Sequence, residues 1–447
     1  MNRSLGLLRK CRVVWATIVL GGFATFGAEQ AKNSSPGPVS DGGAGKLSLP
    51  DAQRVALEKN WDLLAAAAEV DVATAQKIVA SEFPNPTFSF LSSKVNVDHH
   101  PSSTVEGNGV WDRNYDTIFA VNQLFEIGGK RRNRKASAQA GFEMARAQFL
   151  DAKRTLDLAV AKAYVGAVQA EENARVLMES AETLHREAGL ADVRLKAGEI
   201  SSADKNQIEV TAERFELDAK AAQAAALQAR IALEVLLGAS RAHGEVLLSD
   251  SIETLSAIPA PLEANLSGTG RADVVAAEAT LRKAEADLRL QKANRIPDPT
   301  VLAQYEHEPP DTPNSIGLGF SFPLPLWNRN KGNIRAAEAA REQARLAVEK
   351  AEAQAAAEIA TARSAYDSAL RRWQSYRDSI RRKSEQIRKA MAYAYEKGGA
   401  SLLDLLIAER NDNEVRLSAA QAAGDTAVAA ATFKAVTQVI QTSEVRK

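Results

Sequence analysis

The 447-residue sequence has very little of several features that usually mark a function. Cys11 is its only cysteine, which excludes a framework of disulfide bonds and a metal site built from cysteines. Lysine plus arginine number 56, as do aspartate plus glutamate, so no basic excess predicts binding to nucleic acid. Histidines number five, and the sequence lacks the Gly-x-Ser-x-Gly, P-loop and His-Glu-x-x-His motifs. We therefore expect neither catalysis nor a cofactor.

Long apolar runs are also missing. The first 28 residues have a basic start and then an uncharged run, residues 13–28, which is short for a membrane span and typical of a signal peptide. A single membrane anchor is the alternative. Cys11 precedes this run, so it is not placed like a lipid-modified cysteine. No later segment has 18 uncharged apolar residues, so a membrane location would require a closed β-barrel.

Proline is absent from two long stretches of the chain. All 15 prolines fall within residues 36–50, 84–101, 259–261 and 297–325. Because proline breaks the interior of a helix, the proline-free stretches are where long helices can form.

A seven-residue repeat runs through residues 130–196 and again through residues 331–397. Such a repeat predicts a coiled-coil seam. Each stretch would form a helix roughly 100 Å long at 1.5 Å per residue. The seam positions are Phe142, Phe149, Leu156, Ala163, Ala170, Leu177, Leu184 and Ala191 in the first stretch, and Ile359, Tyr366, Trp373, Ile380, Ile387 and Ala394 in the second.

Each long helix is expected to end in a short turn and to be followed by a second helix. The turns are at residues 197–201 and 398–401, where glycine suits a left-handed C-cap and serine suits the next N-cap. This predicts two antiparallel hairpins, at about residues 130–237 and 331–440.

Short segments with two-residue alternation precede each hairpin and predict β-strands. The expected strands are at about residues 85–97, 113–125, 299–308 and 314–326. Polar loops at about residues 98–112 and 308–314 would join them in pairs.

The chain is an internal duplication. Gly198, Ser201 and Asp204 recur 200 residues later as Gly398, Ser401 and Asp404, and the Pro-Asn-Pro-Thr phrase at 84–87 recurs as Pro-Asp-Pro-Thr at 297–300. This divides the chain into a signal peptide and a flexible N-terminal segment, two structural repeats joined by an equatorial linker, and a tail. We expect the signal peptide at residues 1–28 and the flexible segment at 29–47. The two repeats are expected at 48–238 and 271–442, with the linker at 239–270 between them and the tail at 443–447.

Four strands in one chain cannot close a sheet, so several copies would have to pool their strands. Eight strands is the usual minimum, which leaves two, three or more copies open. The layout, the duplicated strand–helix phrases and the Gly-x-x-Ser-x-x-Asp turns resemble the TolC family of outer-membrane factors. The phrases at 126–134 and 323–337 resemble its CzcC-like branch, which is associated with heavy-metal efflux.

The resemblance covers residues ~48–442 and implies a mainly α fold with a small transmembrane β part. It implies a homotrimer with a twelve-stranded β-barrel, four strands per chain, and an α-helical tunnel reaching from the cell outer membrane into the periplasm. The partners would be a periplasmic adaptor, an inner-membrane RND pump and outer-membrane lipid. The conduit would be passive, because the pump supplies the energy.

The candidate functional residues lie at the hairpin turns. The resemblance places Asp204 and Asp404 in the periplasmic mouth, where rings of carboxylates would favour cations. The alternative is that each only stabilises a helix N-terminus. Gly198, Ser201, Gly398 and Ser401 would be the tips that dock the adaptor, and plain capping is the compatible alternative.

Other candidates are weaker. His99 with His100, and His307 between two glutamates, are expected in solvated loops and not as metal sites. Trp111, Tyr115 and Trp327 are candidates for aromatic residues at a membrane interface, with simple packing as the alternative for Trp327. Drug efflux or type I protein secretion is the alternative cargo, and a soluble periplasmic coiled-coil adaptor or scaffold is the alternative architecture.

Overall fold

The computed structural model describes residues 46–93, 116–258, 268, 270–308 and 312–439. Contacts divide the chain after Gly45, and all described residues belong to the unit Lys46–Lys447. The predicted signal peptide, the tail at 443–447 and the predictions for His99, His100, Trp111 and Tyr115 lie outside the described residues. The elements are α1 (Leu49–Lys59), α2 (Trp61–Ser81), β1 (Thr87–Ser93), β2 (Asp116–Leu124), α3 (Lys130–Lys196), α4 (Ser202–Leu236), α5 (Ile252–Ser256), α6 (Ala272–Ala293), β3 (Thr300–Glu308), β4 (Thr312–Ser321), α7 (Lys331–Ser375), η2 (Tyr376–Ile380), α8 (Arg381–Glu396) and α9 (Leu402–Thr437).

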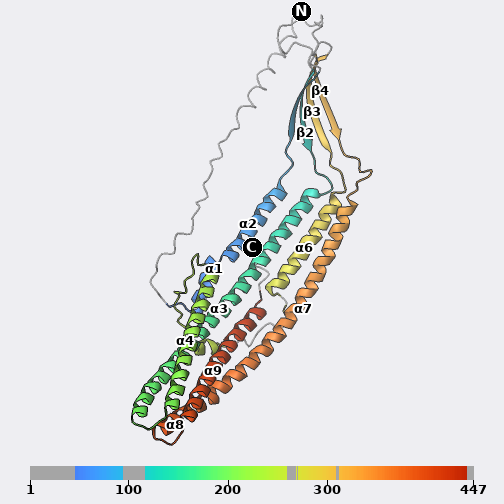
Figure 1. Cartoon of the computed structure of the whole chain (residues 1–447). Coiled ribbons are helices and arrows are strands. Elements are labelled where there is room, and N and C mark those ends of the chain that lie inside the picture. The colour runs from blue at the N-terminus through green and yellow to red at the C-terminus, as the bar shows by residue number, and fades with distance from the viewer. Residues whose placement is uncertain (1–45, 94–115, 259–267, 269, 309–311, 440–447) are drawn as a thin grey trace, which may run out of the picture. The chain divides into compact units, whose positions relative to one another are not determined.

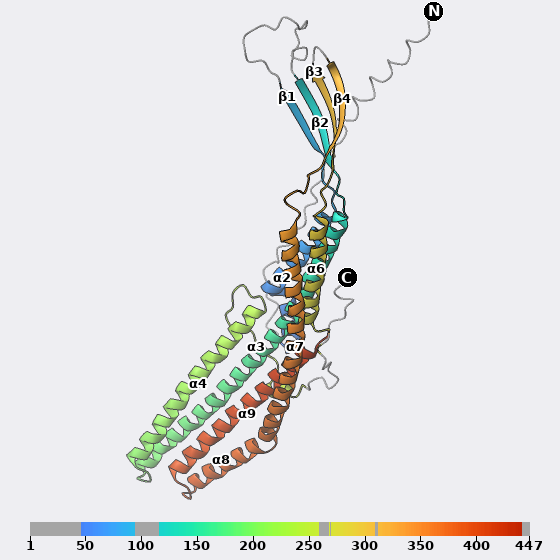
Figure 2. The same cartoon turned by 90° about the vertical axis from the view of Figure 1, so that its right-hand side faces the viewer.

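The long helices pack side by side, with the sheet beyond one end of them. Helix α3 contacts α2, α4, α6 and α9, while α7 contacts α6 and α9. Figures 1 and 2 show the strands at one end of these helices and the α3–α4 and α8–α9 turns at the other end. The mainly helical fold with four strands in the chain is therefore confirmed. Within the described ranges, no helix is both long and apolar enough to span a membrane.

Helix α3 has the length that the sequence predicts. It runs for 67 residues without interruption, and its seam positions from Phe142 to Ala191 are all buried or half-buried. A proline-free, alanine-rich stretch allows this continuity, because every residue keeps its backbone N–H donor and alanine is a strong helix former.

The prediction of a second continuous helix over residues 331–397 is wrong at one place. The π-helical turn η2 separates α7 from α8, and the N–H of Arg381 donates to the carbonyl of Tyr376, five residues back. A π-turn adds a residue and rotates the following helix. Trp373, before η2, is 4% exposed, whereas Ile387, after it, is 56% exposed. The predicted seam therefore leaves the buried side at η2.

The four strands form one antiparallel sheet in the order β1-β2-β3-β4. The register places most of the large apolar side chains, including all the aromatic ones, on one face. There Phe119 of β2 lies between Phe90 of β1, at 5.2 Å between ring centroids, and Tyr305 of β3, at 6.3 Å. The opposite face is mixed: it carries Ser89, Asn122, Gln304 and other small or polar residues, together with Leu91, Ile118, Leu124 and Leu302. The apolar face consists of Phe88, Phe90, Phe119, Val121, Val301, Ala303, Tyr305, Ile316, Leu318 and Phe320.

Two predictions about the strands need correction. Strand β4 ends at Ser321 and not near residue 326, because Pro323 and Pro325 have no N–H to donate to a neighbouring strand. His307 lies inside β3, opposite Thr117, and is 8% exposed, so it is not in a solvated loop.

A β-bridge and hydrogen bonds connect the chain's first described residues to the linker, beside the central core. Leu47 forms a parallel bridge with Leu248, and the Tyr164 hydroxyl lies 2.7 Å from the Leu47 carbonyl and 2.8 Å from the Asp250 carboxylate. Tyr164 is fully buried among apolar residues of α1, α3, α4, α5, α9 and the end of α7. The segment predicted to be flexible therefore ends before Leu47.

Candidate functional site

The two turns at residues 197–201 and 398–401 share a left-handed glycine. Gly198 has φ of 78° and Gly398 has φ of 73°, a region that residues with a Cβ disfavour. Among the described residues, nothing lies within 4 Å of the position that a Cβ would take at either glycine. The backbone conformation, and not the available space, therefore requires glycine here.

The hydrogen bonds of the two turns also correspond. The N–H of Glu199 donates to the carbonyl of Arg194 at 2.9 Å, and the N–H of Gly399 donates to the carbonyl of Ala394 at 2.8 Å. This is the Schellman arrangement, which satisfies carbonyls at the end of a helix. The turns are therefore closed by their own backbone, as the sequence predicts.

Both predicted aspartates cap the helix that follows the turn. The N–H of Asp204 donates to the Ser201 hydroxyl at 3.1 Å, while the N–H of Ser201 donates to the Asp204 carboxylate at 3.2 Å. Ser401 and Asp404 repeat this capping box, with distances of 3.2 and 3.1 Å. The Ser401 hydroxyl and backbone N–H lower the pKa of Asp404 by stabilising its charged form. Capping is thus the role that these contacts demonstrate.

Charged contacts distinguish the first tip from the second. The Lys205 ammonium on α4 lies 3.2 Å from both the Asp192 and the Glu209 carboxylates. Leu405 occupies the corresponding position on α9 and is 3% exposed. The two turns therefore share a backbone but present different chemistry, beyond the difference between Glu199 and Gly399 that the sequence shows.

The structure brings the two tips to the same end of the helices. Figure 2 shows the α3–α4 and α8–α9 turns close together. The Arg194 guanidinium of α3 lies 4.8 Å from the centroid of the Tyr395 ring on α8, a cation–π distance. Asp204 and Asp404 are therefore presented by neighbouring turns of one chain, and a constriction built from several copies stays a prediction.

A buried polar network above the tips was missed from the sequence. The Arg388 guanidinium on α8 contacts Glu409 and Asp412 on α9, and Ser180 on α3 donates to Asn413 on α9. Ser180, Glu409, Asp412 and Asn413 are all less than 9% exposed, and Arg388 is half-buried beside them. The network joins the two hairpins, and no local sequence pattern marks it, because it depends on which faces of α3, α8 and α9 meet.

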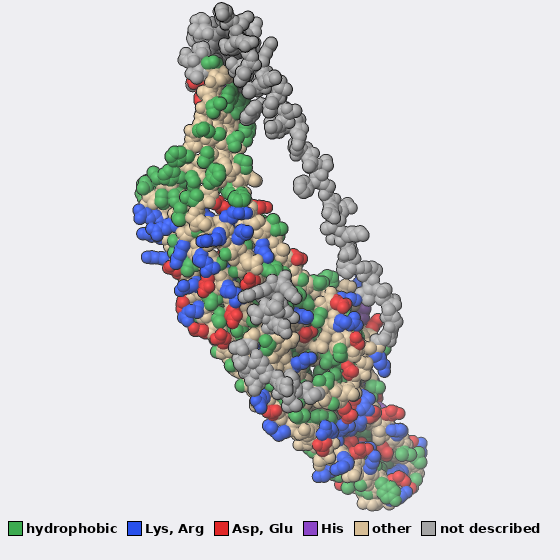
Figure 3. Space-filling model, turned by 180° about the vertical axis from the view of Figure 1, so that it is seen from behind, with side chains coloured by type: hydrophobic (Ala, Val, Ile, Leu, Met, Phe, Trp, Pro, Cys, Tyr) green, Lys and Arg blue, Asp and Glu red, His purple; other side chains and the backbone are tan. Residues whose placement is uncertain are grey.

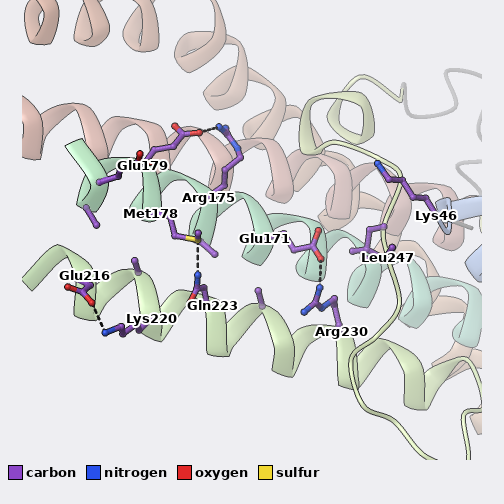
Figure 4. Close-up of a pocket in the computed structure, with 16 residues that line it drawn as sticks. Lys46, Glu171, Arg175, Met178, Glu179, Glu216, Lys220, Gln223, Arg230 and Leu247 are labelled. Carbon is purple, nitrogen blue, oxygen red and sulfur yellow. Dashed lines mark hydrogen bonds and ion pairs between the residues drawn. The ribbon is translucent and has the colours of Figure 1, made fainter. Parts of the chain in front are cut away.

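A groove of 910 Å³ runs between α3 and α4 (Figure 4). Its charged side chains are paired with one another: Arg230 of α4 lies 3.4 Å from Glu171 of α3, and Lys220 lies 2.6 Å from Glu216. The charges of its walls are therefore largely neutralised locally. In the part of the chain that the structure describes, no group of three or more His, Cys, Asp or Glu could hold a metal ion.

Comparisons with known proteins agree with this architecture. The family model described as outer membrane efflux protein matches residues 53–239 and 267–437. The stretch between these two matches falls within the predicted equatorial linker.

Two relatives found by sequence similarity are named as metal-resistance proteins. The cobalt-zinc-cadmium resistance protein CzcC of Cupriavidus metallidurans is 26% identical over 400 residues, covering 87% of this chain and 90% of that protein. The nickel-cobalt-cadmium resistance protein NccC of Alcaligenes xylosoxydans xylosoxydans is 25% identical over 296 residues, covering 66% of this chain and 65% of that protein.

A solved structure shares the fold. CusC, whose structures describe folding and transmembrane channel formation, has a TM-score of 0.69 with 18% identity, over 87% of this chain and 91% of that one. At this identity the likeness establishes the fold alone, and the family rests on the sequence matches. The chain therefore belongs to the outer membrane efflux protein family and, within it, to the CzcC-like branch.

Proposed function

We propose that this chain is the outer-membrane channel component of a tripartite efflux system, forming a passive homotrimeric conduit from the periplasm to the exterior. The observation that carries the proposal is the sheet, which has one strongly apolar face and one more polar face in a chain of the outer membrane efflux family. An apolar face suits lipid, and a polar face suits a water-filled lumen.

The edges of the sheet support an assembly of several copies. Strands β1 and β4 lie at the two edges, and Ile316 and Leu318 of β4 are 83% and 82% exposed. A long apolar edge strand is a template for pairing with another chain. Three copies would join β4 of one to β1 of the next and close a twelve-stranded barrel.

The tips would then be the periplasmic mouth. Three copies would bring together six carboxylates from Asp204 and Asp404, and such rings attract cations. Gly198, Ser201, Gly398 and Ser401 would form the surface that docks a periplasmic adaptor, itself coupled to an inner-membrane RND pump. The unequal chemistry around Lys205 and Leu405 suits an adaptor with two distinct contacts.

The proposed cargo is divalent heavy-metal cations. Support comes from the names of CzcC and NccC, which are resistance proteins for cobalt, zinc, cadmium and nickel. In this arrangement the pump and adaptor select the cargo, and the conduit provides a cation-favouring path.

Three experiments test the proposal: bilayer recording, osmotic-shock fractionation and the metal tolerance of a deletion strain. The purified full-length protein should form cation-preferring channels in a planar lipid bilayer, and release by osmotic shock as a soluble protein would contradict it. A deletion strain should lose tolerance to zinc, cobalt, cadmium, nickel or copper. Unchanged metal tolerance together with lost tolerance to organic toxicants would overturn the metal cargo while keeping the channel.

A further inference from the structure

An exposed apolar surface continues beyond the sheet toward the helices. We define the apolar collar as Phe322, Leu324, Leu326 and Trp327, together with Phe125 and Ile127 after β2. Trp327 is 93% exposed and Leu324 is 65% exposed. Simple packing within the chain therefore does not explain Trp327.

The collar extends the apolar face of β4. Phe322 stacks on Phe320 with ring centroids 6.3 Å apart and an interplanar angle of 1°. Leu324 and Leu326 keep the same two-residue spacing, although Pro323 and Pro325 end the strand pairing. The apolar face thus reaches past the last strand hydrogen bond.

Basic side chains lie next to the collar on the helical side. We define the basic band as Arg132, Lys135, Arg295, Arg329, Lys331 and Arg335. Figure 3 shows hydrophobic side chains gathered below the strands and Lys and Arg side chains directly beneath them. All members of the band are exposed.

The band differs from its basic neighbours in having no acidic partner. Lys130 lies 2.7 Å from the Asp298 carboxylate, and Arg134 pairs with Glu126. Across the described ranges, no member of the band forms an ion pair. The neighbours hold the strand–helix junction together, whereas the band points its charge outward.

The helices that begin here carry charges of the unfavourable sign. Helices α3 and α7 have no acidic residue in the first turn and no side-chain cap, and they start with Lys130 and Lys331. Because Asp298 already pairs with Lys130 at the start of α3, the uncompensated charge is that of Lys331 at the start of α7. Positive charge at a helix N-terminus is repelled by the helix dipole. At the other end of the molecule, α4 and α9 begin with the aspartate capping boxes. An external anion at the collar would relieve this repulsion.

We propose that the apolar collar and the basic band together bind the headgroup region of an acidic phospholipid surface. Trp327 and Phe322 would lie at the boundary between acyl chains and headgroups, where amphipathic and aromatic rings are favoured. Arg329, Lys331 and Arg335 would contact phosphates and anionic headgroups. The inference rests on the proposed outer-membrane location, and it adds a preference of the periplasm-facing side for acidic lipid.

The first test compares lipids in detergent-solubilised full-length protein. At low salt, phosphatidylglycerol in the micelles should raise the midpoint of thermal unfolding by several degrees more than phosphatidylcholine does. This difference should fall by at least about half in a variant with the band neutralised, and it should shrink in high salt in the unmodified protein. The band variant is Arg329→Gln, Lys331→Gln and Arg335→Gln.

A matched control separates the band from general charge. Its three substitutions remove the same number of exposed arginines and lysines from α7 and α8, far from the collar, and should keep the full lipid difference. The control variant is Lys350→Gln, Arg371→Gln and Arg382→Gln. An equal lipid difference in the band variant and the unmodified protein would overturn the inference.

The second test locates Trp327 directly. In proteoliposomes, phospholipids brominated near the headgroup should quench the fluorescence that Trp327→Phe removes. If that fluorescence is not quenched, another copy of the chain covers Trp327 and the lipid assignment fails. Bilayer conductance separates the two proposals: a protein that conducts but shows no lipid preference refutes only this inference, whereas one that does not conduct refutes the proposed function.

Discussion

The Arg388 guanidinium on α8 lies 3.3 Å from the Glu409 carboxylate on α9, and it reaches the Asp412 carboxylate of the same helix at 3.3 Å. One arginine thus forms ion pairs with two buried carboxylates, since Glu409 is 8% exposed and Asp412 is 4% exposed. Burial raises the pKa of Glu409, Arg388 opposes this, and the nearby Asp412 and Glu187 carboxylates add to the rise.

The raised pKa predicts that Glu409→Gln stabilises the protein at neutral and higher pH. A carboxyl whose pKa is higher in the folded state contributes most stability below its ordinary pKa and loses that contribution as pH rises through the raised value. At about pH 8 the variant should therefore unfold a few degrees higher than the unmodified protein. At about pH 4 the two should unfold together. Circular dichroism during heating measures both midpoints.

The exposed Glu414 on the same helix provides the control for this prediction. Glu414→Gln removes the same charge from α9 without removing it from the interior, so it should leave the midpoint nearly unchanged at both pH values. A lower midpoint for Glu409→Gln at high pH would mean that the pair with Arg388 outweighs the cost of burial.

The second prediction concerns the left-handed glycine at the second tip. Gly398→Ala should destabilise the α8–α9 turn by about 1 kcal/mol, because alanine is strained at positive φ. Gly399→Ala is the matched control, since Gly399 has no positive φ and its added Cβ would meet the Ala394 carbonyl at an ordinary 3.5 Å. Amide hydrogen exchange across the turn should show faster opening in the first variant alone. Equal exchange in both would argue against backbone strain.

The third prediction concerns the hydrogen bonds by which Tyr164 of α3 contacts Leu47 and the linker residue Asp250. Tyr164→Phe removes the hydroxyl near Leu47 and Asp250 while keeping the buried ring, and should cost about 1 kcal/mol. Amide exchange at Leu47–Leu49 and at the linker residues beside them should accelerate. Tyr376→Phe is the control, because its hydroxyl has no hydrogen bond to any described residue, and it should leave this exchange unchanged.

The parts of the fold that the sequence predicts are those encoded by local rules. Helix α3 could be bounded because proline is missing inside it and Gly198 follows it. The π-turn η2 could not be predicted, because the stretch lacks proline and the seven-residue spacing of apolar residues continues through it unchanged. The early end of β4 could have been predicted, because Pro323 and Pro325 are present in the sequence and proline has no N–H to donate to a neighbouring strand.

The candidate site divides in the same way. The tips were predictable because Gly, Ser and Asp stand at fixed spacing, and the capping boxes of Asp204 and Asp404 use only neighbouring residues. The contact of Ser180 with Asn413 depends on which faces of α3 and α9 meet, which no local pattern specifies. Long-range pairing between helices is thus what the sequence left open.

The last prediction separates capping from the proposed carboxylate ring. Asparagine at Asp204 and Asp404 keeps a side-chain oxygen that can accept from Ser201 and Ser401, but it removes the charge. Alanine removes both. If the aspartates only cap, the double asparagine variant should conduct like the unmodified channel and the double alanine variant should lose about 1 kcal/mol or more of stability at the tips. If they also form a ring, both variants should show weaker cation preference or higher conductance in a planar bilayer. We expect the second result. A double asparagine channel with unchanged conductance and selectivity would leave capping as their whole role.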